Sequence, residues 1–381
     1  MMNRHYKREL GGVYKTGLSS SGTAAESASP STLLLYDEHF AGHDMGAAHP
    51  ESPERFVACL AALKAAYDPA DGGDGSGLRW CSDSPHVTEE QLLRVHTPEY
   101  IEQLRATLDE AAEDGITIAL DPDTSASPGT REAVLRGSGG VCAAVDDLMS
   151  GAARNAFCLV RSPGHHAESD HAMGFCFVNN VMVAAAHALE AYPETVRRVA
   201  ILDFDVHHGN GTAEQTVLRN IDNEDSAQHD VLYLSTHQHP HYPGTGESQT
   251  IDGMMLVPSD LERLGVVNAP MSPPGTFPFW DSSSQFREVV TEKIMPALRA
   301  FEPDLLILSA GWDGHVEDPL AGLELSDEDY TWVTGESLKV AEEFCEGRVL
   351  SVLEGGYNVP ALARCVTAHV AQLRAEALAR A

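Results

Sequence analysis

Basic residues are scarce in this chain of 381 residues, which has 25 Lys and Arg against 57 Asp and Glu, for a formal net charge of −32 at pH 7. A surface of this sign repels phosphate groups, so we expect neither general nucleic-acid binding nor binding to anionic membranes. Two explanations of the acidity stay open. We favour a strongly solvated surface suited to a salty cytosol, and the alternative is attraction of a cationic substrate.

Long apolar runs and paired cysteines are missing as well. No apolar run approaches the roughly 20 residues that a membrane-spanning helix needs, so we expect no membrane partner. The 7 cysteines form no CxxC pair. An odd number of unpaired thiols is typical of a reducing compartment. The sequence therefore predicts a soluble intracellular protein, most simply cytoplasmic, with a nuclear or organellar location open for a eukaryote.

Residues 1–31 are rich in Ser, Gly and Ala and lack the apolar centre of a signal peptide. They predict a disordered tail before a single domain over residues 32–381. A basic, Ser-rich organelle-targeting segment is the alternative, which Glu9 and Glu26 weaken.

Short apolar runs alternate with amphipathic stretches along the rest of the chain. We expect strands at 32–36, 156–160, 198–205, 230–235, 304–309 and 348–356. We expect helices at 53–66, 98–108, 130–149, 178–191, 284–300, 327–344 and 360–379. This alternation predicts an α/β domain whose mainly parallel central sheet is flanked by helices on both faces. Residues 219–230 and 249–265 are expected to be surface insertions.

Polar side chains stand where several predicted strands end. In "LDFDVHHGNGT" (202–212), Asp203, Asp205 and His207 alternate, so an extended backbone places them on one side. Similar polar segments follow other strands: "RSPGHHAESDHAMGF" (161–175), "STH" (235–237), "SAGWDGH" (309–315) and "EGGYN" (354–358). Because parallel sheets bind ligands beyond the carboxyl ends of their strands, we expect these segments to converge on an active site there.

Asp205, His207 and Asp313 provide two carboxylates and one imidazole. This donor set suits a catalytic Zn²⁺ site with a position left for water, and Fe²⁺ stays open. A bound metal would lower the pKa of a water molecule towards about 7 and polarise a carbonyl group.

Adjacent imidazoles at His165 and His166 offer a general base for that water and an acid for a leaving amine. Asp203 and Asn210 are the residues that we expect to fix their tautomers. Tyr357 follows two glycines and can donate a hydrogen bond to a developing oxyanion.

Six segments, taken in order, resemble the histone deacetylase family, most closely its class II and bacterial branch, which has the arginase/deacetylase fold. The segments are "HPESPERF" (49–56), "RSPGHHAESDHAMGFCFVNN" (161–180), "VAILDFDVHHGNGT" (199–212), "STHQHPHYPGTG" (235–246), "SAGWDGHVEDPLAGL" (309–323) and "VLEGGYN" (352–358). The resemblance extends over roughly residues 32–374, so residues 32–381 are expected to form a catalytic domain.

The resemblance implies a role for each matching residue. Asp205, His207 and Asp313 would hold zinc. His166, beside Asn210, would be the general base and acid, His165 with Asp203 an electrostatic helper, and Tyr357 the group that polarises the acyl carbonyl. Phe175 and Tyr242 would wall the substrate channel, Leu320 would line its mouth, and Arg55 would line an inner cavity below the metal. Gly356 would also contact the substrate. A structural K⁺ would be bound by main-chain oxygens of Asp203, Asp205, His207 and Thr236, with the Asp203 carboxylate and the Ser235 hydroxyl.

Some positions depart from the family pattern. Asn210 stands where class I enzymes have Asp, which supports the class II branch. Trp312 and Gly314 replace the more usual Phe and Ala beside a metal ligand, which puts the shape of the pocket in doubt but not the ligation of the metal. The expected insertion at 219–230 puts the second cation site of the family in doubt.

The activity implied is hydrolysis of the acetyl-lysine amide in histones or other proteins and peptides by metal-activated water. Acetylpolyamines or other small acyl amines are the alternative substrates. A silent acyl-lysine-binding module would lack a metal ligand or Tyr357, and all are present. A dinuclear manganese ureohydrolase would need further bridging aspartates that this sequence lacks. The oligomeric state is not predicted.

Overall fold

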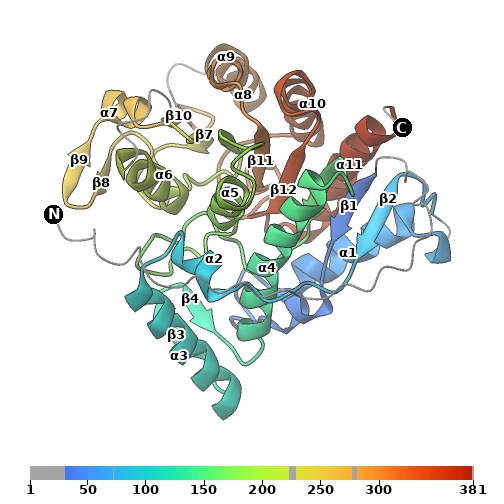
Figure 1. The fold of residues 1–381 in the computed structure, drawn as a ribbon, viewed down its shortest axis with the longest axis vertical. Coiled ribbons are helices and arrows are strands. Elements are labelled where there is room, and N and C mark those ends of the chain that lie inside the picture. The colour runs from blue at the N-terminus through green and yellow to red at the C-terminus, as the bar shows by residue number, and fades with distance from the viewer. Residues whose placement is uncertain (1–30, 72, 223–228, 277–280, 380–381) are drawn as a thin grey trace.

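An eight-stranded sheet forms the centre of the computed structural model, which describes residues 31–71, 73–222, 229–276 and 281–379 (Figure 1). Its strand order is β10-β7-β6-β11-β12-β5-β1-β2, and every neighbouring pair is parallel. The strands are β1 Thr32–Leu35, β2 Leu78–Cys81, β5 Asn155–Cys158, β6 Val199–Asp203, β7 Val231–Gln238, β10 Val266–Met271, β11 Leu305–Ala310 and β12 Val349–Leu353. The predicted α/β fold is confirmed. Apart from Ser31, the predicted tail lies outside the described residues.

Helices cover both faces of the sheet (Figure 1). Helices α4 and α5 pack together, and α11 packs against both α1 and α10. The helices are α1 Pro53–Tyr67, α2 Glu89–Leu93, α3 Pro98–Asp114, α4 Thr130–Met149, α5 Asn180–Ala191, α6 Asn210–Asp222, α7 Pro258–Arg263, α8 Ser282–Val289, α9 Met295–Phe301, α10 Asp327–Phe344 and α11 Val359–Ala379. Among the described residues, none of the helices has the length and apolar character needed to cross a membrane.

The central strands are short and apolar because the helices bury them on both faces. Every residue of β5, β6, β7, β11 and β12 is buried. Continuous runs of Leu, Ile, Val and Ala are therefore expected, in place of the alternating pattern of a half-exposed strand. Since these strands are parallel, the segments that follow them emerge at one edge of the sheet.

Several elements differ from the sequence prediction. The edge strands β2 and β10 were missed, because β2 is only half-buried and β10 contains Asn268 and Pro270, both uncommon in strands. The single helix predicted at 284–300 is instead α8, a π-helical turn at Val290–Ile294 and α9. Pro296 lacks the N–H that would continue an α-helix through this point.

The two expected insertions also contain regular structure. Residues 249–265 form a hairpin of β8 Gln249–Ile251 and β9 Met254–Leu256, followed by α7. Ile251 and Leu261 of this segment are buried in the main core, so it is integrated into the fold. Helix α6 was not predicted and extends to Asp222, and residues 223–228 lie outside the described residues. A second small hairpin, β3 Ile118–Asp121 and β4 Thr124–Ala126, lies away from the central sheet.

Candidate functional site

Three donor side chains converge beyond the ends of β6 and β11. The backbone N–H of Gly355 donates to Asp205 Oδ2 at 2.8 Å, and that of Val206 donates to Asp313 Oδ1 at 2.8 Å. The second oxygen of each carboxylate then faces His207, whose Nδ1 lies 3.1 Å from Asp205 Oδ1 and 3.0 Å from Asp313 Oδ2. The predicted ligand trio is therefore assembled, with its ligand atoms within 4.8 Å of one another.

The electrostatics of this trio fit a bound cation. Burial raises the pKa of Asp313, and the charge of Asp205 raises it further. Burial opposes a charged His207, yet Asp313 and Asp205 outweigh it and raise the pKa of His207 to about 10. Two buried carboxylates thus require a positive charge between them, and a divalent metal bound by two oxygens and a nitrogen would supply it. The residues present fit such a metal.

Two glycines let the backbone approach these carboxylates. A Cβ on Gly311 would overlap the carboxylate of Asp205, and a Cβ on Gly355 would overlap Asp313 Oδ2 and lie 2.5 Å from Asp205 Oδ2. Any larger residue at either position would displace a ligand oxygen. Gly311 was not singled out from the sequence, because a close approach between distant segments leaves no local pattern.

His165 is held by a carboxylate, as expected. Its Nδ1 lies 3.0 Å from Asp203 Oδ2, which also accepts a hydrogen bond from Tyr233 Oη at 2.9 Å. Burial opposes a charged ring, but Asp205 and Asp203 outweigh it and raise the pKa of His165 to about 10. Sequence reasoning missed Tyr233, whose only signal is a hydroxyl within an otherwise apolar predicted strand.

His166 lies beside His165 but has the opposite electrostatic character. Their ring centroids are 4.0 Å apart, and His166 Nδ1 lies 2.7 Å from Asn210 Oδ1, also as expected. Burial and the positive charges of His165 and His207 hold the pKa of His166 well below 6.5. An amide oxygen only accepts hydrogen bonds, so Nδ1 of His166 carries the proton and the neutral ring keeps Nε2 free as a base.

Glu354 holds the backbone directly before and at His165, and sequence reasoning did not assign it a role. This buried carboxylate accepts hydrogen bonds from the backbone N–H of Gly164 at 2.6 Å and of His165 at 3.2 Å. Ser309 Oγ donates to its other oxygen at 3.1 Å. Glu354 thereby joins the end of β12 to the segment that follows β5. Its position at a strand end, directly before two glycines, is the signal that could have identified it.

The turn that carries Tyr357 is fixed on one side by Arg55. The buried guanidinium donates to Gly356 O at 2.7 Å and to Glu354 O at 2.5 Å, and it also pairs with Glu51 at 3.0 Å. It lies 5.0 Å from the centre of the Tyr357 ring. Arg55 is therefore behind the aromatic ring, consistent with the expected inner position.

Asp318 fixes the same turn from the other side. Its Oδ2 accepts hydrogen bonds from the backbone N–H of Tyr357 at 2.6 Å and of Asn358 at 3.1 Å, while Leu320 N donates to Oδ1 at 3.0 Å. Burial and the nearby charge of Asp313 raise the pKa of Tyr357, so its hydroxyl stays protonated and able to donate. Leu320 is half-buried on the same loop.

Two aromatic residues of the expected channel lie over this site. The Phe175 ring is 5.8 Å from that of Tyr357, and the Tyr242 ring is 5.2 Å from that of His166 and 6.1 Å from that of His207. Tyr242 is 37% exposed, so it also reaches the surface. The two rings therefore lie beside Tyr357 and beside the histidines of the site.

Trp312, at which the sequence left the shape of the pocket in doubt, is buried beside the metal-ligand candidate Asp313. Its ring is 2% exposed and packs behind Asp313, 6.0 Å from Phe204 and 5.5 Å from His369. The side chain therefore fills the core. At Gly314, a Cβ would lie 2.9 Å from Tyr330 Oη, which explains why Ala would be crowded there.

The residues expected to bind K⁺ are also adjacent. Ser235 on β7 is paired with Asp203 on β6, and both are buried. The Ser235 hydroxyl lies 2.8 Å from His237 Nδ1. Thr236 Oγ1 has no hydrogen-bond partner among the described residues.

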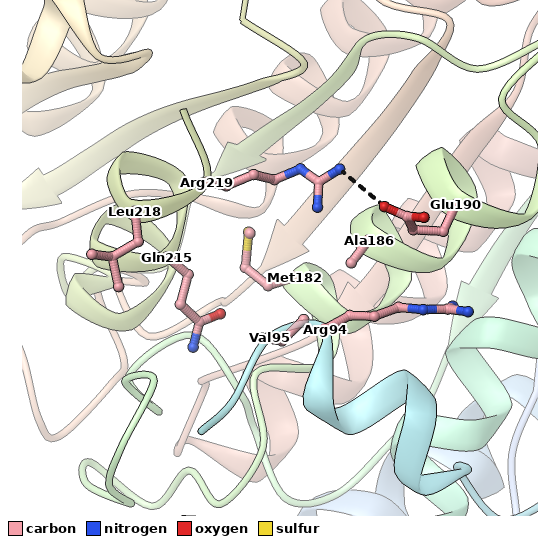
Figure 2. A pocket seen from close by; sticks show the side chains of 8 residues that line it. All are labelled: Arg94, Val95, Met182, Ala186, Glu190, Gln215, Leu218 and Arg219. Carbon is pink, nitrogen blue, oxygen red and sulfur yellow. Dashed lines mark ion pairs between the residues drawn. The ribbon is translucent and has the colours of Figure 1, made fainter. Parts of the chain in front are cut away.

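A separate cavity of about 290 Å³ lies between α2, α5 and α6 (Figure 2). Figure 2 shows Arg219 and Glu190 facing each other across it, with 3.9 Å between Nη2 and Oε1. Its lining is Arg94, Val95, Met182, Ala186, Glu190, Gln215, Leu218 and Arg219. None of the predicted site residues lines this cavity.

The sequence and the fold of this chain resemble those of known proteins. The histone deacetylase domain family matches residues 49–373. The histone deacetylase-like amidohydrolase of Pseudomonas aeruginosa is 33% identical over 91% of this chain and 82% of its own length. Type-2 histone deacetylase 2 of Dictyostelium discoideum is 33% identical over 90% of this chain, which spans 21% of that longer protein. The crystal structure of the HDA15 HD domain has a TM-score of 0.74 and 31% identity, over 91% of this chain and 88% of that one.

Proposed function

Since this chain belongs to the histone deacetylase family of hydrolases, we propose that it is a zinc-dependent deacetylase that hydrolyses the amide of acetyl-lysine. One observation carries the proposal: Asp205, His207 and Asp313 converge beside a neutral His166 and a protonated Tyr357. The catalytic domain would extend over residues 32–381.

Zinc, when bound by Asp205, His207 and Asp313, supplies activation of a water molecule and polarisation of the acyl carbonyl. His166 Nε2 accepts a proton from the attacking water and later donates it to the leaving amine, so the products are acetate and the free amine. The Tyr357 hydroxyl donates a hydrogen bond to the carbonyl oxygen as negative charge develops there. His165, whose pKa is raised, would place a positive charge beside His166, and the Asp203 carboxylate would balance it.

The channel residues would hold the substrate in line with these groups. Phe175 and Tyr242 would flank the aliphatic arm of the acylated amine, with Leu320 near the mouth. Gly356 and Arg55 would define the end of the channel behind Tyr357. A passage between two aromatic rings would favour an extended acyl-lysine or acylpolyamine arm over a branched substrate.

The substrate class is tested by measuring acetate release from acetyl-lysine peptides and from N-acetylspermidine, with metal content determined on the same samples. Faster turnover of the peptides supports the proposal, and a clear preference for acetylspermidine would replace it with the small-amine alternative. Repeating both assays at increasing KCl tests electrostatic attraction, because screening would lower kcat/KM for a cationic substrate and leave a neutral one unchanged.

We further propose that K⁺ is bound by main-chain oxygens of Asp203, Asp205, His207 and Thr236, with the Asp203 carboxylate and Ser235 hydroxyl. The adjacency of Asp203 and Ser235 on neighbouring strands supports this site. A thermal midpoint that rises with KCl but not with tetramethylammonium chloride is expected. An equal response to the two salts would contradict specific K⁺ binding.

A further inference from the structure

Asn210 connects His166 to a second carboxylate, that of Glu168. The Asn210 oxygen Oδ1 faces His166 Nδ1 at 2.7 Å, and its nitrogen Nδ2 donates to Glu168 Oε1 at 2.5 Å. Glu168 is itself anchored, since its backbone N–H donates to His171 O at 3.1 Å and its carbonyl faces His96 Nδ1 at 3.0 Å. Its side chain is 23% exposed, and Oε2 lies 3.8 Å from His171 Nε2.

The direction of these hydrogen bonds is determined by Glu168. A carboxylate only accepts hydrogen bonds, whereas an amide has one donating and one accepting end. With the Asn210 amide reversed, its oxygen would lie against the Glu168 oxygen, and its NH₂ group would face His166. The remaining contact of Asn210 Nδ2, Met173 Sδ at 3.2 Å, is only a weak acceptor and does not fix the orientation as strongly.

We propose that Glu168 is a positioning residue, whose carboxylate orients the Asn210 amide so that His166 carries its proton on Nδ1 and keeps Nε2 free. The proposal rests on the proposed function in one respect, the use of His166 Nε2 as the general base. It also distinguishes the two histidines. His165 contacts the Asp203 carboxylate directly, whereas a neutral amide separates His166 from Glu168.

Substitutions at position 168 test this role. We expect Glu168→Ala to lower kcat by about 10- to 100-fold with little change in KM, because the effect reaches the substrate through His166. Glu168→Gln keeps an acceptor for the amide and should retain more activity. Asp170→Asn removes the same charge from an exposed side chain of the same loop, and kcat should stay at the wild-type value.

The Asn210→Asp background separates orientation from general structural support. Residue 210 then only accepts hydrogen bonds, so Glu168 faces another carboxylate. Glu168→Gln should therefore raise kcat in this background, although it lowers kcat beside Asn210. A structural role alone would give a loss in both backgrounds, and that result would overturn the proposal.

A measurement that needs no turnover completes the test. Protein with ¹⁵N-labelled histidine, loaded with zinc, should show His166 as the Nδ1–H tautomer in long-range ¹H–¹⁵N spectra, assigned with a His166→Gln variant. Glu168→Ala should convert it to a mixture of tautomers, whereas an unchanged tautomer contradicts the role of Glu168. Failure of the wild type to release acetate from any acetyl-lysine peptide would instead contradict the proposed function, and the tautomer would still decide the role of Glu168.

Discussion

The described residues contain three clusters of potential metal ligands, and two of them, which adjoin at Asp313 and His315, differ in how their donor atoms are used. The first is Asp205, His207 and Asp313, and the second is His315, Asp327 and Cys365. In each cluster the ligand atoms lie within 4.8 Å of one another. Residue types and spacing therefore do not distinguish the two, and the hydrogen bonds around them must.

In the second cluster every group already has a matched partner. The backbone N–H of Glu317 donates to His315 Nδ1 at 3.1 Å, so His315 carries its proton on Nε2 and donates to Asp327 Oδ1 at 3.1 Å. Cys365 Sγ donates to the same oxygen at 3.0 Å, and Arg364 Nε donates to Oδ2 at 3.3 Å. Three donors thus surround one carboxylate, which has no need of a metal.

In the first cluster two carboxylates share one side-chain partner. Backbone N–H groups donate to Asp205 Oδ2 and Asp313 Oδ1, and that of His207 donates to Asp205 Oδ1 at 2.9 Å. Asp205 Oδ1 and Asp313 Oδ2 both face the same imidazole nitrogen, Nδ1 of His207. Two carboxylates and one histidine leave an excess of negative charge once His207 is deprotonated. A candidate metal site is therefore distinguished by carboxylate oxygens that lack matched side-chain donors, and not by the proximity of the ligand atoms alone.

Matched substitutions in the two clusters should give the largest contrast. We expect Asp313→Ala to abolish turnover and most metal binding, since it removes one of three ligands. Asp327→Asn should retain both the metal content and kcat of the wild type. Metal analysis by mass spectrometry and acetate release measure the two effects. Full metal content with a near-normal rate in Asp313→Ala, or metal loss in Asp327→Asn, would contradict the assignment.

Tyr357→Phe should separate catalysis from metal binding by the first cluster, because Tyr357 is not one of its ligands. The variant loses only the hydroxyl, so folding and metal content should stay the same while kcat falls about 10²–10³-fold, roughly 2.7–4 kcal/mol. Steady-state kinetics on an acetyl-lysine peptide test this. A rate within about twofold of wild type would exclude the hydroxyl from the reaction, and a change confined to KM would indicate substrate binding instead.

The site was more predictable than the contacts that support it. The Asp-x-Asp-x-His spacing at 203–207 follows a strand, so one local pattern predicted three converging residues, including Asp205 and His207. Glu354, Asp318 and Glu168 were not given roles, because each acts on a segment that is distant in sequence or on another polar side chain. Such contacts leave no periodic signal in a single sequence.

The fold shows the same division. Strands β5, β6, β7, β11 and β12 were predicted because burial on both faces requires continuous apolar runs. The edge strands β2 and β10 are held by pairing with a neighbouring strand on one side, and their sequences are correspondingly mixed. Pairing of this kind is a tertiary interaction and is not encoded in the segment itself.

His369 offers a further contrast with His207, because burial lowers its pKa, whereas two carboxylates raise the pKa of His207. Burial lowers the pKa of His369 to about 3, and its ring contacts the Thr334 and Ser351 hydroxyls at 2.8 Å each. In the unfolded chain the His369 ring takes up a proton below a pH of about 6.5, whereas in the folded chain it stays neutral down to a pH of about 3. The free energy of unfolding therefore falls as the pH decreases from about 6.5 to 3. Between pH 7.5 and 5.5 this residue should contribute about 1.4 kcal/mol to the fall.

Urea unfolding of wild type and His369→Gln at both pH values measures that contribution. The variant should be less stable at pH 7.5, because it loses at least one hydrogen bond, but its stability should fall less on acidification. Parallel pH dependences in the two proteins would show that folding leaves the pKa of His369 unchanged.

The smallest effect should come from the exposed edge of the second cluster. Arg364 pairs with Glu317 at 2.7 Å and with Asp327 at 3.3 Å, and the three side chains are 46%, 47% and 42% exposed. Water and salt screen such pairs, so Arg364→Gln should cost less than about 1 kcal/mol at low ionic strength and less still in 1 M KCl. Urea unfolding at the two salt concentrations measures the difference. The first cluster is buried, so salt does not screen its charges in this way. A salt-independent loss of stability larger than about 1 kcal/mol in Arg364→Gln would mean that Arg364 supports the second cluster through packing or a buried hydrogen bond. The distinction between an exposed and a buried cluster would then fail.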